Sequence, residues 1–181
     1  MRPPPRAYWI LMPVIWLSLV QPLGAQVLEI GNAAGAIGDV VALDITFRAA
    51  KAGVSALVGD IQFDPIAVSL EHCTINPAIG PGTASDKTLS ISVTRSNLAR
   101  FVVFGLGRTT IPSSRVFRCE FAVLPGALAL SEFTQTSGGS NRARATDLTL
   151  ETVSAADPDG AAVTLTLKPG KITIHPGRPR N

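Results

Sequence analysis

The sequence predicts an all-β fold, a single domain in which two antiparallel sheets form a sandwich. From Gln26 onward, short runs of alternating apolar and polar residues are separated by Gly, Pro, Asn and Asp, which form turns. No apolar run with a 3.6-residue period reaches helix length with capping residues. About nine short strands with turn signals between them are typical of a two-sheet sandwich. No linker-like stretch divides the chain, so one domain is expected.

The first 25 residues have the layout of a secretory signal peptide. Arg2 and Arg6 give a positive start, residues 7–20 form a largely apolar run, and small residues end at Ala25. This order predicts export, with cleavage between Ala25 and Gln26. A retained membrane anchor is the alternative interpretation, but a spanning helix needs about 20 apolar residues.

Removal of the signal peptide changes the composition. Of the 181 residues 156 remain, which is enough for one domain with a sizeable core. The net charge falls from +3 to +1 because Arg2 and Arg6 are lost, so the mature chain has no signal for nucleic-acid binding. Every Trp, Tyr and Met is also lost, and the aromatic residues that remain are seven Phe.

The segment Gly31–Phe47 could be a phosphate-binding loop or the approach to a strand. Its glycines fit neither of the Gly-rich phosphate-loop patterns, and no helix is expected after them. Apolar residues then alternate with Ala42, Asp44 and Thr46, as in a strand with one buried face. We therefore expect the glycines to turn the chain into an antiparallel strand.

The other strands follow the same reasoning. The expected segments are Val27–Ile30, Asp39–Ala49, Ala56–Phe63, Val68–Thr74, Leu89–Arg95, Arg100–Gly105, Val116–Leu124, Ala127–Phe133, Leu148–Val153, Ala162–Leu167 and Lys171–Ile174. Loops are expected where Gly, Pro and Ser gather, as over residues 136–144. The domain extends over residues 26–175, and residues 176–181 are predicted to be a disordered tail.

The alternation in Ala56–Phe63 assigns its side chains to two faces. Leu57, Gly59, Ile61 and Phe63 share the inward face, and the outward positions are Ala56, Val58, Asp60 and Gln62. Two apolar residues that point outward on a central strand would form a contact patch. A neighbouring loop that covers them is the alternative.

Cys73 and Cys119 are the two cysteines of the chain. In an exported protein such a pair indicates a disulfide. The bridge would be worth about 4 kcal/mol, because it closes a loop of 46 residues. Two buried free thiols are the second interpretation. A metal site ranks below both, because two Cys without clustered His do not complete a tetrahedral shell.

No constellation of residues indicates catalysis. A Ser–His–Asp or Cys–His site would have to use His72, since His175 adjoins the tail. Cys119 lies on an inward face, and no G-x-S-x-G elbow occurs. Asp157–Gly160 reads DPDG, but the position that needs Glu in a calcium loop is Lys168, so a tight turn is expected. We therefore predict no enzyme, no cofactor and no metal.

The order of the motifs resembles the cohesin domain, the module that binds dockerins in bacterial cellulosomes. "GAIGDVVALDITF" is similar to the opening of that family, and "GVSALVGDIQFDP" is similar to its next strand, which ends in Asp-Pro. "RVFRCEFAV" and "DPDGAAVTLTLKPGKITI" are similar to its later strand and to its closing turn and strands. The resemblance covers roughly residues 26–175 and rests on the order and spacing of the motifs.

The resemblance implies a nine-stranded jelly-roll sandwich and a secreted or periplasmic bacterial protein that binds without catalysis. A dockerin-like or other protein partner and an association with polysaccharide breakdown are implied with it. Dockerin-binding cohesins of the best-known type carry polar Asn and Asp where this chain has Ala56 and Val58, which supply no side-chain hydrogen bonds. The cysteine pair is also not general among cohesins. The chain thus resembles a module outside the typical cellulosome set.

Three functions follow, in order of preference. The first is a secreted protein–protein binding module with Ala56, Val58, Asp60 and Gln62 on its binding face. The second is a carbohydrate-binding module that acts through polar contacts, because the mature chain has no Trp or Tyr to stack on sugar rings. An exported enzyme is third. No membrane span is expected after signal cleavage.

Overall fold

A computed structural model of the chain describes residues 25–50, 53–129 and 143–175. The strands are β1 (Gln26–Ile30), β2 (Asn32–Ala36), β3 (Val40–Arg48), β4 (Ala56–Gln62), β5 (Val68–Ile75), β6 (Thr88–Arg95), β7 (Leu98–Phe104), β8 (Ser114–Val123), β9 (Arg144–Ala156), β10 (Ala162–Val163), β11 (Leu165–Lys168) and β12 (Gly170–His175). One short helix, α1, spans Gly126–Ala129. No helix within the described ranges is long and apolar enough to cross a membrane.

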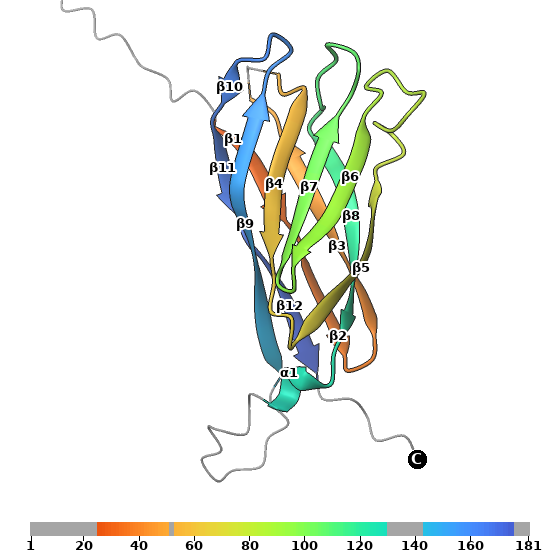
Figure 1. Cartoon of the computed structure of the whole chain (residues 1–181), viewed down its shortest axis with the longest axis vertical. Coiled ribbons are helices and arrows are strands. Elements are labelled where there is room, and N and C mark those ends of the chain that lie inside the picture. Colours follow the sequence, from red (N-terminus) through yellow and green to blue (C-terminus); the bar gives the residue numbers. More distant parts are fainter. Residues whose placement is uncertain (1–24, 51–52, 130–142, 176–181) are drawn as a thin grey trace, which may run out of the picture.

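The strands form the predicted two-sheet sandwich (Figure 1). One sheet has the order β11-β1-β3-β8-β5, and the other has the order β2-β12-β9-β4-β7-β6, with β10 paired to β9. β4 therefore lies inside its sheet, between β9 and β7. Most pairs are antiparallel, but β1 pairs with β11 and β2 pairs with β12 in parallel.

The core lies between the two sheets. Inward residues of β3, among them Leu43, Ile45 and Phe47, are almost completely buried, in the alternation that the sequence predicts. Phe101 of β7 packs on Phe117 of β8 with ring centroids 5.2 Å apart, so aromatic side chains join the two sheets. Burial of side chains of this size contributes about 2–3 kcal/mol each.

The glycine-rich segment before β3 differs in part from the prediction. Asn32–Ala36, expected as a turn, forms strand β2 and pairs with β12. This pairing joins segments that are far apart in the sequence, so local alternation does not reveal it. The expected turn lies at Ile37–Asp39, where Gly38 has φ +86° and Asp39 donates its backbone N–H to the carbonyl of Ala36.

The strand expected at Ala127–Phe133 is wrong over its described part. The chain forms α1 there, and residues 130–133 lie outside the described ranges. A Cβ at Gly126 would lie 2.8 Å from the carbonyl oxygen of Ile66, so the close approach requires glycine.

The strand expected at Ala162–Leu167 is divided in two: β10 pairs with β9, and β11 joins β1 in the other sheet. The predicted signal peptide up to residue 24 and the predicted tail also lie outside the described residues.

Candidate binding face

Strand β4 places the four predicted residues on the outer face of its sheet. Leu57, Gly59 and Ile61 are buried in the core, as the alternation predicts. Ala56, Val58, Asp60 and Gln62 occupy the other phase, and Val58 is 37% exposed in the middle of the sheet. Because β9 and β7 flank β4, these side chains lie within a continuous sheet surface.

An apolar groove of about 300 Å³ surrounds Val58. Side chains from β4, β7, β9 and β10 line it, among them Ala56, Val58, Val102, Ser154, Ala156 and Ala162. Val58 lies opposite Val102 on one side and Ser154 on the other, and Ala56 lies opposite Ala156. The groove forms because small side chains surround the two valines, and its size and apolar lining suit an apolar side chain.

Two further apolar residues lie at and just after the C-terminal end of β7. Phe104 ends β7, pairs with Thr88 of β6 and is 41% exposed, in the outward phase of Val102. Leu106 follows in the next loop and is 99% exposed. Single exposed apolar residues are common on protein surfaces, whereas large contiguous apolar patches are typical of interaction sites.

The loop that carries Leu106 is held by polar contacts on its C-terminal side. Arg108 donates to the carbonyl of Pro158 at 3.2 Å and forms an ion pair with Asp159. Lys87 is fully buried, and its ammonium donates to the carbonyl of Thr109 at 2.6 Å. Burial lowers the pKa of Lys87. These contacts join the C-terminal side of the loop to the turn at residues 157–160 and to the residue before β6.

Asp60 is part of a cluster that the sequence alone did not reveal. The residue is only 3% exposed, although its position faces outward. Arg100 donates through Nε and Nη2 to its two oxygens at 2.8 and 2.9 Å, and the Thr152 hydroxyl donates at 2.6 Å. The Arg100 hydrogen bond holds the pKa of Asp60 below its ordinary value.

The cluster depends on an irregularity in β9. Thr152 has φ +47°, and the register between β4 and β9 shifts between Val58 and Asp60. A β-bulge of this kind re-aims a side chain, here towards Asp60. Arg100 lies directly opposite Asp60 on β7, so a correct strand register would have predicted this pair, whereas Thr152 had no signal in the sequence.

The far end of β4 borders a polar hollow of about 270 Å³. Its lining is Gln62, Phe63, Asp64, Asp147 and Thr149. The Thr149 hydroxyl lies 3.3 Å from the Gln62 side-chain oxygen, and Arg144 lies 3.7 Å from Asp64. Gln62 is thus on the same outer face as Val58 but in polar surroundings.

The outer face of the other sheet carries mainly charged pairs. Arg118 donates to both oxygens of Asp44 at 2.7 and 3.1 Å, and Arg115 lies 3.7 Å from the same carboxylate. His72 lies 3.8 Å from Glu120. Val40 is exposed there at the start of β3. Such a charged, hydrated surface resists burial against an apolar partner.

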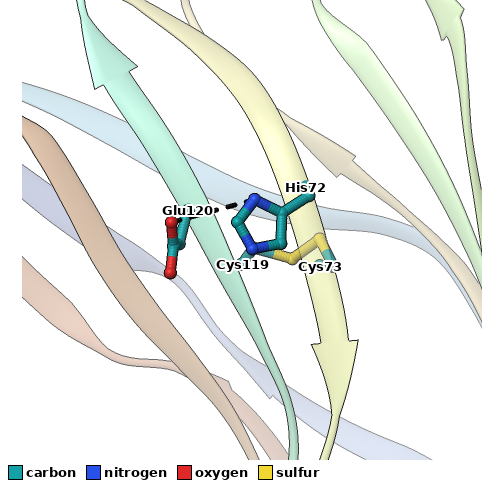
Figure 2. Close-up of a disulfide and its surroundings, with 4 residues drawn as sticks. All are labelled: His72, Cys73, Cys119 and Glu120. Carbon is teal, nitrogen blue, oxygen red and sulfur yellow. Dashed lines mark ion pairs between the residues drawn. A yellow bond between two sulfur atoms is a disulfide. The ribbon is translucent and has the colours of Figure 1, made fainter.

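The two cysteines are joined in a disulfide. Cys73 of β5 and Cys119 of β8 are direct cross-strand neighbours with Cα atoms 4.0 Å apart. Figure 2 shows the bridge beside His72 and Glu120. Because both sulfurs are bonded, neither is a nucleophile that His72 could activate. The disulfide fits an oxidising compartment.

The DPDG segment is the expected turn. One oxygen of the Asp157 carboxylate accepts the backbone N–H groups of Asp159 and Ala161 at 2.9 and 2.8 Å. Gly160 has φ +84°, and its N–H donates to the carbonyl of Asp157 at 3.1 Å. A calcium loop would need this Asp157 carboxylate as a ligand, but here it accepts the backbone N–H groups of the turn. Within the described ranges no three His, Cys, Asp or Glu side chains are grouped to hold a metal.

Ala25 and Gln26, the predicted cleavage site, lie where the ordered sheet begins. Ala25 is exposed, and β1 starts at Gln26. The cleavage itself stays a prediction.

No protein-family model and no curated protein matches the sequence. Among solved structures, a cohesin of OlpC in complex with a dockerin from Clostridium thermocellum is similar, with a TM-score of 0.68 and 14% identity over 84% of this chain and 95% of that chain. A cohesin of ScaC bound to the ScaB dockerin from Acetivibrio cellulolyticus has a TM-score of 0.63 and 20% identity over 83% and 99% of the two chains.

A non-cellulosomal cohesin from the archaeon Archaeoglobus fulgidus is also similar, with a TM-score of 0.62 and 12% identity over 83% of this chain and 91% of that chain. At these identities the likeness concerns the fold. The chain has a cohesin-like fold, and the predicted fold class is confirmed.

Proposed function

We propose that the protein is an exported, non-catalytic binding module that docks a protein partner on the outer face formed by β9, β4, β7 and β6. The observation that carries this proposal is the apolar groove around Val58, in the middle of a sheet face. Exposed Phe104 and Leu106 extend the apolar surface. Interfaces use such apolar and aromatic anchors at their centre and exclude water around them.

The contrast between the two outer faces supports this choice. Ion pairs from Asp44 to Arg118 and from His72 to Glu120 occupy the opposite face, and their burial would cost desolvation energy. On the proposed face, the ionic pair of Asp60 and Arg100 lies beside the groove, and the groove itself has no charged lining. An apolar partner surface therefore fits this face.

The neighbours with known partners bind dockerins, so a dockerin-like module is the first partner class to test. Ala56 and Val58 supply no side-chain hydrogen bonds at the positions where the best-known cohesins have Asn and Asp. A partner must therefore contact them through apolar groups. On this ground we propose a module outside the typical cellulosome set; the similar structures include a non-cellulosomal cohesin as well as dockerin-bound cohesins.

Export is the second part of the proposal. The signal-like order of residues 1–25 and the disulfide both favour a secreted or periplasmic bacterial protein. A link to extracellular polysaccharide binding or breakdown follows from the resemblance to cohesins.

A partner-capture experiment with Val58→Asp tests the binding face. The substitution places a charge in the groove, and burial of that charge against an apolar partner costs a few kcal/mol, or at least about tenfold in affinity. The matched control is Thr74→Asp, an exposed strand position on the opposite sheet. The full chain, purified as the cell processes it, is used to capture partners from the native secretome, and each captured protein is then titrated in pure form.

Val58→Asp should lose the partner while its melting temperature stays unchanged, and Thr74→Asp should keep the partner. Equal capture by wild type, Val58→Asp and Thr74→Asp would show that the partner docks elsewhere. A large fall in the melting temperature of Val58→Asp would show that Val58 belongs to the core.

The polar hollow favours a second candidate, carbohydrate binding through polar contacts. Gln62, Asp64, Asp147 and Thr149 offer donors and acceptors around one depression. Calorimetric titration with soluble plant and bacterial oligosaccharides tests it. Binding that Gln62→Ala abolishes and Val58→Asp leaves intact would support this candidate in place of the first.

A further inference from the structure

Arg100 presents a fixed and unused guanidinium edge next to the apolar groove. Its Nε and Nη2 atoms donate to Asp60, and the side chain is still 52% exposed. Within the described residues, Nη1 has no hydrogen-bond acceptor. The bidentate pair holds the guanidinium plane in one orientation.

A second donor lies beside this edge. Ser92 of β6 is directly opposite Arg100, is exposed, and makes no side-chain hydrogen bond within the described part of the chain. Direct cross-strand neighbours have Cβ atoms about 5 Å apart, so the hydroxyl and Nη1 can reach one acceptor. Arg95, also on β6, adds positive charge that acts on Asp60.

The other charges on this face leave that corner positive. Glu151 of β9 lies opposite Asp60, on the side away from Arg100. Strands are spaced about 4.8 Å apart, so Glu151 is about 14 Å from Ser92, which is more than one Debye length at physiological salt. The corner formed by Ser92, Arg95 and Arg100 therefore favours an anionic acceptor.

We infer that Arg100 determines the specificity of the binding face by donating a hydrogen bond to an acidic side chain of the protein partner, whose neighbouring apolar residue occupies the groove at Val58 and Val102. This inference rests on the proposed function and names the chemistry of the partner. Val102 and Arg100 are two residues apart on β7, which is about 7 Å along a strand. The partner thus presents an apolar and an acidic side chain at that spacing, two apart in a strand or three to four apart in a helix.

The test uses random peptides displayed on phage, selected against the full chain as the cell processes it. Peptides that bind wild type and fail to bind Val58→Asp define ligands of the groove. Among these, Asp or Glu should be enriched at one position next to an apolar residue. A representative peptide and its Glu→Gln or Asp→Asn counterpart are then titrated against wild type, Arg100→Gln and Arg100→Lys.

The four combinations of wild type and Arg100→Gln with the acidic and amide peptides form a double-mutant cycle. Loss of the carboxylate should weaken binding to wild type by at least about tenfold and should leave binding to Arg100→Gln nearly unchanged. Arg100→Lys keeps the charge and should retain part of the preference. Arg100→Gln could also act only by leaving the Asp60 carboxylate without its partner. In that case the variant would bind the acidic and the amide peptide equally weakly, and this result would overturn the inference.

Groove-dependent peptides without an acidic preference would overturn the inference and leave the proposed function in place. Failure to obtain any peptide that depends on Val58 would overturn both. Binding of soluble polygalacturonate that needs Arg100 and ignores Val58→Asp would assign the corner to an acidic polysaccharide instead of a protein.

Discussion

Removal of the disulfide should lower the stability of the domain by several kcal/mol. The bridge between Cys73 and Cys119 closes a loop of 46 residues, and loss of this constraint from the unfolded chain is worth about 4 kcal/mol at 25 °C. For a domain of this size, each kcal/mol shifts the melting temperature by about 2–4 °C, so a fall of about 8–16 °C is expected. The double variant Cys73→Ser/Cys119→Ala suits the site, because Cys73 is partly exposed and Cys119 is fully buried.

Thermal unfolding followed by circular dichroism measures the effect on three samples: oxidised wild type, reduced wild type and the double variant. Reduced wild type and the double variant should unfold at nearly the same temperature, since both lack only the crosslink. Added reductant should not change the double variant. The reasoning is refuted if the double variant unfolds within about 3 °C of the oxidised protein, or if the oxidised protein contains two reactive thiols.

Three further predictions concern the acid stability, the packing and the N-terminus. The Arg100 hydrogen bond holds the pKa of Asp60 below its ordinary value of 3.8, so its stabilising effect is present above that pH and is lost as the pH falls through the lower, folded-state pKa. Asp60→Asn should therefore reduce the melting temperature at neutral pH and flatten its decline in acid; parallel acid profiles would contradict this. Gly59→Ala should destabilise the domain by about 1–3 kcal/mol in urea unfolding, because the new Cβ would lie 2.8 Å from Val153 and 2.9 Å from Phe101; an unchanged midpoint would show that both side chains can move. Mass spectrometry of the exported protein should find Gln26 at the N-terminus; an intact Met1 in a membrane fraction would indicate a retained anchor.

The alternation of side chains was sufficient to predict the two-sheet architecture and most of its strands, but not which strands pair with each other. In β3 the burial follows the sequence pattern residue by residue, and in β4 it does so except at Asp60, which faces outward but is buried. Strand β2 was missed because its pairing with β12 is parallel and long-range, and the segment is rich in Ala and Gly. The division of Ala162–Leu167 was missed for a related reason, since β10 and β11 belong to different sheets.

The sequence predicted the orientation of the candidate residues on β4 but not the contacts that they make. The sequence identified Ala56, Val58, Asp60 and Gln62 as outward, and the structure places them there. Asp60 was predicted only to face outward, and its burial by Arg100 and Thr152 was not predicted. These contacts depend on strand register and on the bulge in β9, and neither is encoded in the local alternation.

The burial of Asp60 has a consequence for binding. A free arginine side chain on a surface loses about 2 kcal/mol of rotamer entropy when a partner immobilises it. Arg100 is already held by both oxygens of Asp60, so folding has fixed its guanidinium before the partner arrives. The Thr152 hydroxyl holds Asp60 through a hydrogen bond. The backbone of Thr152 has φ +47°, a conformation that costs a non-glycine residue about 1 kcal/mol or more. Because that cost is borne in the unbound protein, the three residues together act as a preorganised hydrogen-bonding group beside an apolar groove, and Asp60 is the residue that positions Arg100.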